Sequence, residues 1–291
     1  MDSDMNDSNR TTAQPQEPET AAEQRQLIRR RRELSREQLD KILAWERERK
    51  LRLADPAELQ LATPEEARQF YYPTGVPNPV VLTWSEELVA AREPFSDRAE
   101  EFRVLRTQLL ASVFSGIDRP ALAVVSAEDG DGKSYLAANL AISLSQFAGR
   151  TLLIDGNLRR PRLHRLFATD APVGLSNLLA GSGHGEAVVR IEGVDGLHLM
   201  GAGTVMPDPV QLLQGPRLGL LVQEMLERFD HVLFDTPANS MGPDARIITA
   251  QAGSALVVGR KGRSRITLLK RLLSQLDLGH SLVAGVVLNQ R

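Results

Sequence analysis

Six continuous apolar runs follow one another along the part of the chain after Pro120. They lie at residues 121–127, 151–156, 197–203, 231–236, 254–260 and 283–289. These runs lack the strict apolar–polar alternation of a half-exposed strand, and helical stretches separate most of them. Strands that are buried on both faces and alternate with helices are typical of a mostly parallel sheet. The pattern predicts a doubly wound α/β domain over residues 95–291.

The first 94 residues have a different pattern. Residues 1–24 lack apolar periodicity and are rich in Asp, Glu, Gln, Thr and Pro, which predicts a disordered tail. Residues 25–73 contain two capping-box helix starts, at Ser35 and Thr63, and are expected to form a small helical module. A proline-rich stretch follows, so residues 74–94 are predicted to be a linker. Within the domain, a helix is expected from Ser96 to about Phe114.

Composition and charge exclude several classes of protein. The net charge of −2 and the pI of about 6.3 give no overall basic field for nucleic acid. The absence of cysteine excludes disulfides and thiolate metal sites. No apolar run resembles a signal peptide or is long enough to cross a bilayer. We therefore expect a cytoplasmic protein that meets a membrane only through a partner. The run Arg29–Arg32 is interpreted as a solvated helix start, with contact to anionic lipid as the alternative.

The first predicted strand leads into a phosphate-loop pattern. Residues 127–134 read A-x-x-x-x-G-K-S, with alanine in place of the motif's first glycine. Gly130 and Gly132 allow backbone N–H groups to wrap around phosphate oxygens. Lys133 supplies a cation, and the Ser134 hydroxyl is placed to coordinate Mg²⁺. ATP and Mg²⁺ are therefore predicted to bind at Glu128, Asp129, Gly130, Asp131, Gly132, Lys133, Ser134 and Tyr135.

Two of the later apolar runs end at a carboxylate. Asp235 ends the run 231–236 and is followed by Thr-Pro, and a carboxylate there can hold Mg²⁺ through water. Asp155 ends the run 151–156, just before Gly-Asn-Leu-Arg-Arg-Pro. Ligands of such sheets bind beyond the carboxyl ends of the strands, which is where both acids are expected.

The order of these motifs resembles that of the bacterial protein-tyrosine kinases of polysaccharide export, relatives of the MinD/ParA-type ATPases. The phosphate loop, "LLIDGNLRRPRLH" at 152–164 and "FDTPANSMGPDA" at 234–245 carry the resemblance, which covers about residues 95–291. "GVVLN" at 285–289 is similar to the family's strand whose asparagine, here Asn289, lies near the base. "EEFRVLRTQL" is similar to the family's E-x-x-R-x-x-R oligomerisation helix, and its matching residues are Glu100, Arg103 and Arg106.

The resemblance implies transfer of the ATP γ-phosphate to a tyrosine hydroxyl. It assigns catalytic roles to Lys133, Asp155, Arg159 and Asp235, and Mg²⁺ binding to Ser134, Asp155 and Asp235. It also implies homo-oligomers and a membrane chain-length-determinant partner, a polysaccharide co-polymerase, that brings the protein to the periphery of the inner membrane. Residues 34–73 resemble the small N-terminal helical domain of type II secretion and pilus ATPases, an extension also carried by exopolysaccharide kinases of exosortase-linked gene clusters.

Two features depart from the family pattern. Asn157 stands where the family has Asp, and an amide carries no charge and is no base. If that acid were the base, the chain would be slow or inactive; if Asp155 is the base, Asn157 weakens Mg²⁺ binding and turnover remains. We expect reduced but real ATP chemistry. The tyrosine-rich tail of the family is missing, and the only tyrosines are Tyr71, Tyr72 and Tyr135. The acceptor is therefore expected on another protein or in the hinge, unless ATP acts only as a switch.

Three functions stay open on the sequence alone. The first is a tyrosine kinase of exopolysaccharide synthesis. The second is a scaffold that keeps the nucleotide site without phosphorylating protein, which Asn157 favours. The third is a MinD/ParA-like positioning ATPase. Residues 128–131, which are Glu-Asp-Gly-Asp, argue against the third, because such ATPases carry a second lysine early in the phosphate loop.

Overall fold

The computed structural model describes residues 83–115, 120–147, 149–170, 172–182, 187–206, 208–279 and 281–290. The predicted tail, the predicted helical module with its arginine run, and the hinge tyrosines Tyr71 and Tyr72 lie outside these residues. The predictions made for them stay predictions.

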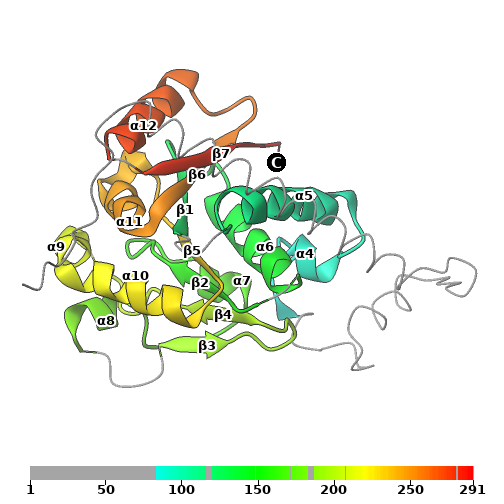
Figure 1. Cartoon of the computed structure of the whole chain (residues 1–291), viewed down its shortest axis with the longest axis horizontal. Helices are drawn as coiled ribbons and strands as arrows, with labels where there is room; N and C mark the ends of the chain where they lie inside the picture. The colour runs from blue at the N-terminus through cyan, green and yellow to red at the C-terminus, as the bar shows by residue number, and fades with distance from the viewer. Residues whose placement is uncertain are drawn as a thin grey trace, which may run out of the picture.

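A seven-stranded sheet forms the centre of the described structure (Figure 1). Its strand order is β3-β4-β2-β5-β1-β6-β7, and every neighbouring pair is parallel except β3 with β4. This arrangement confirms the predicted doubly wound α/β fold, and the six predicted strands are all present. The strands are β1 Ala121–Ser126, β2 Thr151–Asp155, β3 Val188–Arg190, β4 Leu197–Met200, β5 His231–Asp235, β6 Gly253–Arg260 and β7 Leu282–Asn289.

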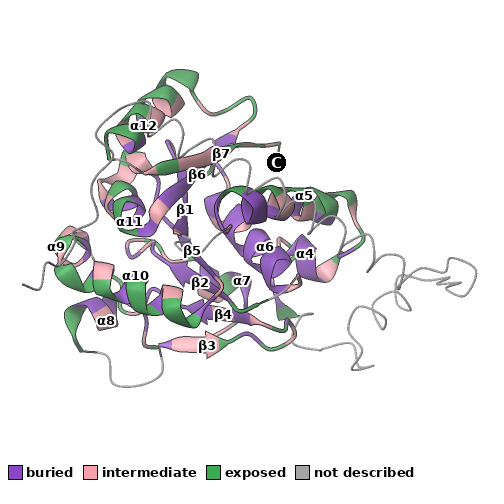
Figure 2. Cartoon of the chain, in the orientation of Figure 1, coloured by how far each residue is buried: buried purple, intermediate pink, exposed green. Residues whose placement is uncertain are grey.

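Helices cover both faces of the sheet, and two apolar cores lie between the layers. On one side lie α4 Val89–Arg92, α5 Asp97–Ser112, α6 Lys133–Ser145 and α7 Leu163–Leu166. On the other side lie α8 Leu175–Ala180, α9 Val210–Gln214, α10 Pro216–Arg228, α11 Asp244–Ala252 and α12 Ile266–Leu278, and the short 3₁₀ helix η1 Asn239–Met241 follows β5. All residues of β1, β2 and β5 are buried, as Figure 2 shows for the centre of the sheet.

Strand β3 was not predicted from the sequence. It is three residues long, lies at the edge of the sheet and is only partly buried, so it gives no continuous apolar run. The helix predicted from Ser96 is confirmed as α5, because the Ser96 hydroxyl accepts a hydrogen bond from the N–H of Ala99 at 3.2 Å.

The segment just before α5 differs from the predicted linker over residues 74–94. Trp84 and Leu88 are buried in the core beside α6. The Asn139 side chain of α6 accepts a hydrogen bond from the N–H of Ala90 at 2.9 Å and donates one to the carbonyl of Glu87 at 2.8 Å. The described part of this stretch therefore belongs to the α/β domain. This short apolar segment was not predicted from the sequence, because a proline-rich stretch precedes it.

Candidate functional site

The carboxyl ends of β2 and β5 bring two carboxylates together. Asp155 and Asp235 are the last residues of these neighbouring parallel strands and are paired in register. Both side chains are buried, with exposed fractions of 1% and 0%. The third strand of this edge is β1, whose Val124 pairs with Asp235 and which leads into the phosphate loop. This order of strands brings the two acids and the phosphate loop to one edge of the sheet, which is where ligands of such sheets bind.

The phosphate loop turns from β1 into α6 through two glycines with left-handed backbone. Gly130 has φ of 81° and Gly132 has φ of 98°, a region that L side chains rarely adopt. A Cβ at Gly132 would also collide with the side-chain amide of Asn289, which donates a hydrogen bond to the carbonyl of Asp131 at 3.1 Å. Asn289 thus lies against the loop, as its predicted place near the nucleotide requires. Helix α6 starts directly after the loop, so its free N–H groups face the same edge.

Lys133 is buried at the base of the loop. Its ammonium donates a hydrogen bond to the Ser126 hydroxyl at 3.0 Å, and that hydroxyl donates to the carbonyl of Glu128 at 2.6 Å. Burial lowers the pKa of Lys133, while nearby carboxylates, Asp235 first, oppose this change. Ser126 was not singled out from the sequence, because a serine at the end of an apolar strand gives no signal of its own.

Asp155 holds the loop that follows it through backbone hydrogen bonds. One carboxylate oxygen, Oδ1, accepts from the N–H of Asn157 at 3.1 Å. The other, Oδ2, accepts from the N–H groups of Arg162 and Leu163, both at 3.0 Å. Burial raises the pKa of Asp155 to about 7, and the neighbouring charge of Asp235 adds to the rise. The protonated form of this acid is therefore favoured relative to an exposed aspartate.

Asp235 lacks such support. Within the described residues neither of its oxygens has a hydrogen-bond partner, although both are buried. Burial raises its pKa to about 6, and the Ser134 hydroxyl and the Lys133 ammonium nearby limit the rise. A buried carboxylate with unmet oxygens beside a second buried acid fits a divalent cation. No group of three or more His, Cys, Asp or Glu side chains that could hold a metal occurs in the described part of the chain. Mg²⁺ would therefore bind to Asp155, Asp235 and the Ser134 hydroxyl, with water as the remaining ligands.

Arg159 is paired with an acid of α11. Its Nε and Nη2 donate hydrogen bonds to the carboxylate of Asp244 at 3.2 Å each. Asp244 is 1% exposed and begins α11. This buried ion pair ties the loop after β2 to the helix after β5. Asp244 was missed as a site residue, because 85 positions separate it from Arg159.

Asn157 points its amide into the same loop. Its Oδ1 accepts a hydrogen bond from the N–H of Arg160 at 3.1 Å, and the residue is partly exposed. The amide thus replaces a carboxylate as the acceptor that closes this turn. Arg160 itself is exposed, and its guanidinium lies 3.8 Å from the carboxylate of Asp129 across the site.

The acidic residues of the phosphate loop have different neighbours. Asp131 is fully buried, and its Oδ1 accepts a hydrogen bond from the Ser264 hydroxyl at 2.7 Å. Glu128 accepts one from the N–H of Arg265 at 3.3 Å, whereas Asp129 is exposed. Glu128 and Asp131 therefore hold the loop between β6 and α12, and a direct nucleotide contact from their side chains stays a prediction. The Tyr135 ring packs edge-on against Phe102, with ring centroids 5.7 Å apart.

The three residues predicted for oligomerisation do not share one surface. Glu100 and Arg103 form an ion pair of 2.6 Å on the outer side of α5. Arg106 is 5% exposed, donates to the carbonyl of Ser143 at 3.0 Å and stacks over the ring of Phe147, which follows α6. Its packing here is intramolecular, and its role in oligomerisation stays a prediction. A subunit contact through Glu100 and Arg103 stays a prediction. In the described residues, the search for a helix long and apolar enough to span a membrane finds none.

Comparison with known proteins finds relatives over the α/β domain. No family model matches the chain. EpsB of Ralstonia nicotianae is 36% identical over 203 residues, which are 69% of this chain and 27% of EpsB. Tyrosine-protein kinase CpsD of Streptococcus agalactiae is 30% identical over 206 residues, which are 70% of this chain and 89% of CpsD. The chain thus spans about a quarter of the length of the EpsB-type relatives and most of the length of CpsD.

Solved structures agree with these relatives. The kinase domain of the Escherichia coli tyrosine kinase ETK has a TM-score of 0.66 at 27% identity, covering 69% of this chain and 79% of that domain. The chimerical protein CapA2B2 has a TM-score of 0.66 at 26% identity, covering 71% of this chain and 91% of that one. The cell division ATPase MinD of Pyrococcus furiosus matches less of the chain, 58%, with a TM-score of 0.51. These likenesses agree with the site geometry: the chain belongs to the family of bacterial tyrosine-protein kinases, within the MinD-like phosphate-loop fold.

Proposed function

We propose that this chain transfers the γ-phosphate of ATP to a tyrosine of another protein in exopolysaccharide synthesis. The observation that carries the proposal is the register pairing of Asp155 with Asp235 at one sheet edge, beside Lys133 and the phosphate loop. Membership of the tyrosine-protein kinase family supports the acceptor class. The sequence resemblance supports the pathway and a membrane chain-length-determinant partner that completes the site.

Mg²⁺ would be held by Asp155, Asp235 and Ser134. When bound, it neutralises charge on the phosphate oxygens during transfer. The residues fit this ion because the two buried oxygens of Asp235 lack hydrogen-bond donors in the described residues and its charge lies beside that of Asp155. Lys133 and the free N–H groups at the start of α6 would neutralise the remaining phosphate charge.

Asp155 is the residue we assign to proton transfer. Its Oδ2 already accepts two backbone hydrogen bonds and Oδ1 accepts one, so Oδ1 retains more capacity to accept a proton. Burial raises the pKa of Asp155 above the usual range of an aspartate, and a carboxylate with a raised pKa is a better proton acceptor. Arg159 is a positioning residue in this proposal, because Asp244 engages its guanidinium.

The acceptor segment would enter beside the loop that Asp155 holds. A cavity of about 780 Å³ lies against this loop and is lined by Arg159, Arg160, Arg162 and Arg165 together with Glu87. Its surplus of guanidinium groups suits an acceptor tyrosine that is flanked by acidic residues.

A scaffold that binds ATP without phosphorylating protein is the second candidate, and Asn157 favours it. The amide removes one negative charge beside the metal site. Replacing it with Asp keeps the acceptor for the N–H of Arg160, so Asn157→Asp would leave the turn intact while it strengthens Mg²⁺ binding.

The test uses the full chain, radiolabelled ATP and the cytoplasmic segment of the chain-length-determinant partner. The proposal expects label on tyrosine, a loss of that label in Asp155→Asn, a gain in Asn157→Asp, and little change in the control Asp277→Asn, an exposed acid on α12. Nucleotide-dependent assembly without label would instead support the scaffold. ATP binding that produces neither label nor assembly contradicts both.

A further inference from the structure

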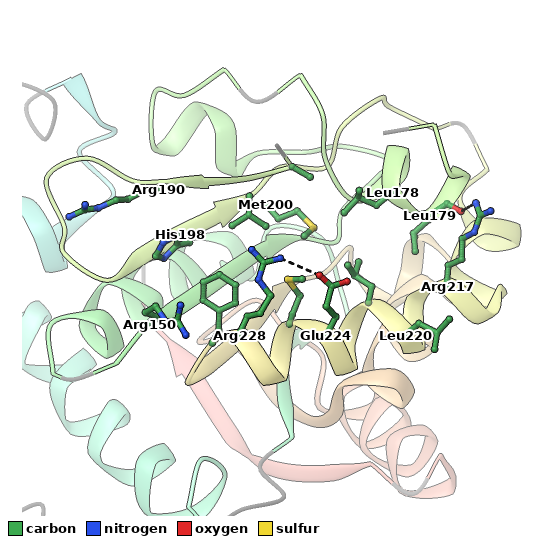
Figure 3. A pocket seen from close by; sticks show the side chains of 15 residues that line it. Arg150, Leu178, Leu179, Arg190, His198, Met200, Arg217, Leu220, Glu224 and Arg228 are labelled. Atoms are coloured by element: carbon green, nitrogen blue, oxygen red, sulfur yellow. Dashed lines mark hydrogen bonds and ion pairs between the residues drawn. The ribbon is translucent and has the colours of Figure 1, made fainter. Parts of the chain in front are cut away.

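A second recess lies on the face of the sheet that carries α10, at the β3 edge. It has a volume of about 600 Å³ and runs between α10 and strands β3 and β4 (Figure 3). Its floor comes from two register pairs of the antiparallel strands, Val188 with Met200 and Arg190 with His198. Alternate residues of a strand point to one face, so both pairs point into the same recess. We call this recess the α10 groove.

The wall of the α10 groove is one stripe of α10. Arg217, Leu221, Glu224 and Arg228 line the recess at steps of four, three and four residues, which places them on one face of the helix. From Arg217 to Arg228 the helix rises by about 16 Å, at roughly 1.5 Å per residue. Figure 3 shows Arg217 at one end of the groove, Arg190 and Arg150 at the other, and Arg228 between them.

The groove is cationic although the chain as a whole carries a net charge of −2. Arg150, Arg190, Arg217 and Arg228 line it. Arg228 pairs with Glu224 at 3.2 Å and Arg190 pairs with Asp195 at 2.9 Å, while the Arg217 guanidinium donates to the carbonyl of Leu179 at 2.9 Å, so positive groups still outnumber the carboxylates. Desolvation lowers the pKa of His198, so its ring is neutral at pH 7 and adds no charge.

Apolar groups fill the space between the two ends. Leu178 and Val188 are partly exposed in the groove, and Met200 and Met225 are buried beneath them. Leu220 is 64% exposed at the rim. At one end the Phe229 ring has the guanidinium groups of Arg150 and Arg228 at 5.8 and 5.9 Å from its centroid. Guanidinium groups that lie over an aromatic ring form a preoriented platform for a carboxylate.

We propose that the α10 groove docks an acidic peptide segment of a partner protein. An extended chain advances about 3.3 Å per residue and its side chains alternate between two faces, so carboxylates six residues apart point to one face and lie about 20 Å apart, within reach of the long Arg217 and Arg228 side chains. Apolar side chains between them on the same face would contact the partly exposed Leu178 and Val188 and the exposed Leu220. Charge complementarity identifies the occupant, because four guanidinium groups line the groove against the two carboxylates that pair with Arg190 and Arg228.

The groove is separate from the phosphoryl-transfer site and goes beyond the proposed function. Arg150 precedes the first residue of β2, whereas Asp155 is the last residue of that strand. The docking end at Arg150 therefore lies at the opposite edge of the sheet from the acid pair. A partner held there would stay bound while its other segments reach the kinase site.

The test measures fluorescence anisotropy of a fluorescein-labelled peptide, Glu-Ser-Val-Ser-Leu-Ser-Glu, with the full chain at low salt. The same peptide with lysine in place of both glutamates is the matched probe. We expect the acidic peptide alone to bind and to weaken as salt rises. Arg150→Glu and Arg217→Glu should each reduce its affinity by about tenfold, and Leu220→Ser should reduce it less. Arg271→Glu, an exposed arginine on α12, is the control and should have no effect.

Magnesium-dependent ATP binding of each variant, measured alongside, reports whether it is folded. The proposal is overturned if the acidic peptide does not bind, if the lysine peptide binds equally well, or if Arg271→Glu weakens binding as much as Arg217→Glu. Arg217-dependent binding to phosphatidylglycerol vesicles without peptide binding would assign the groove to a membrane surface. Arg217-dependent self-association of the chain would assign it to a second copy, and either result contradicts the peptide.

Discussion

Asp235 is buried without a hydrogen-bond donor in the described residues and lies next to a second buried acid, Asp155. Such a pair is unfavourable when both members are ionised and no cation is present. We therefore expect the two adjacent charges to favour binding of a cation and, without one, to lower the stability of the folded chain.

The pH dependence of folding reports this cost. Burial raises the pKa values of Asp155 and Asp235 from 3.8 to about 7 and about 6. Between these values and 3.8 the folded chain binds more protons than the unfolded chain, so its stability falls as pH rises through this window. Without Mg²⁺, Asp235→Asn should raise the free energy of unfolding at pH 8 by about 1–3 kcal/mol. It should also make the stability fall less steeply as pH rises.

Urea unfolding in EDTA between pH 4 and pH 8 measures this effect. Asp277→Asn, an exposed acid on α12, is the matched control and should follow the wild-type curve. A variant Asp235→Asn that is less stable than wild type at pH 8 would show that the acid pair stabilises the fold, against this account.

Sequence motifs predicted the residues that lie next to each other along the chain or end neighbouring strands. The phosphate loop and the two strand-end acids belong to this group, because the order of a parallel sheet brings such ends to one edge. Ser126 and Asp244 fall outside this group. Ser126 acts through its hydrogen bond with Lys133, and Asp244 acts through its ion pair with Arg159. No sequence motif encodes either contact.

Among the elements, the phosphate loop and the loop between β6 and α12 form one unit. Asp131 connects them, since it accepts hydrogen bonds from the Ser264 hydroxyl at 2.7 Å and from the N–H of Glu128 at 3.3 Å. The carbonyl of Asp131 also receives the amide of Asn289 from β7. The shape of the phosphate loop is thus maintained by elements far along the chain.

Asp131→Ala should loosen this unit. It leaves the Ser264 hydroxyl without its acceptor and should cost about 1–3 kcal/mol of stability, with an ATP affinity reduced by roughly tenfold. Calorimetric titration with Mg-ATP and thermal unfolding measure both. Asp129→Ala, an exposed neighbour in the same loop, should keep wild-type stability. Equal losses in the two variants would contradict the assigned role of Asp131.

Elements with strong periodicity were predicted and short ones were not. The buried strands and α5 have long apolar patterns, whereas β3 has three partly buried residues. The four-residue helix α4 is likewise too short for a periodic signal, yet its residues are buried. Tertiary packing against α6 and β4, and not local propensity, defines these two elements.

Across the whole described molecule, the N-terminal boundary of the α/β domain depends on a few anchored residues. Leu88 is fully buried beside α6, in the stretch that the sequence suggested was a linker. Leu88→Ala should reduce the free energy of unfolding by about 2–5 kcal/mol, as for a core leucine. Leu278→Ala, at a leucine that is 80% exposed, is the control and should change stability by less than about 0.5 kcal/mol. Denaturant titration compares the two, and a neutral Leu88→Ala would restore the linker interpretation.

The proposed functional surfaces lie on different parts of the molecule. The kinase site lies at the carboxyl edge of the strands, the α10 groove runs along one outer face, and the ion pair of Glu100 with Arg103 lies on the opposite helical layer. Because the chain spans 27% of EpsB and 89% of CpsD, the family includes both much longer proteins and proteins of similar extent. Surfaces for partners are therefore expected around a compact kinase domain.

The most direct test of the central claim is calorimetric titration of the full chain with ATP, with Mg²⁺ and with EDTA. We predict binding that is much tighter with Mg²⁺, and a loss of this magnesium dependence in Asp235→Asn but not in Asp277→Asn. If ATP binds equally well in EDTA, or if Asp235→Asn keeps the full magnesium dependence, then the paired acids do not hold the metal and the account is contradicted.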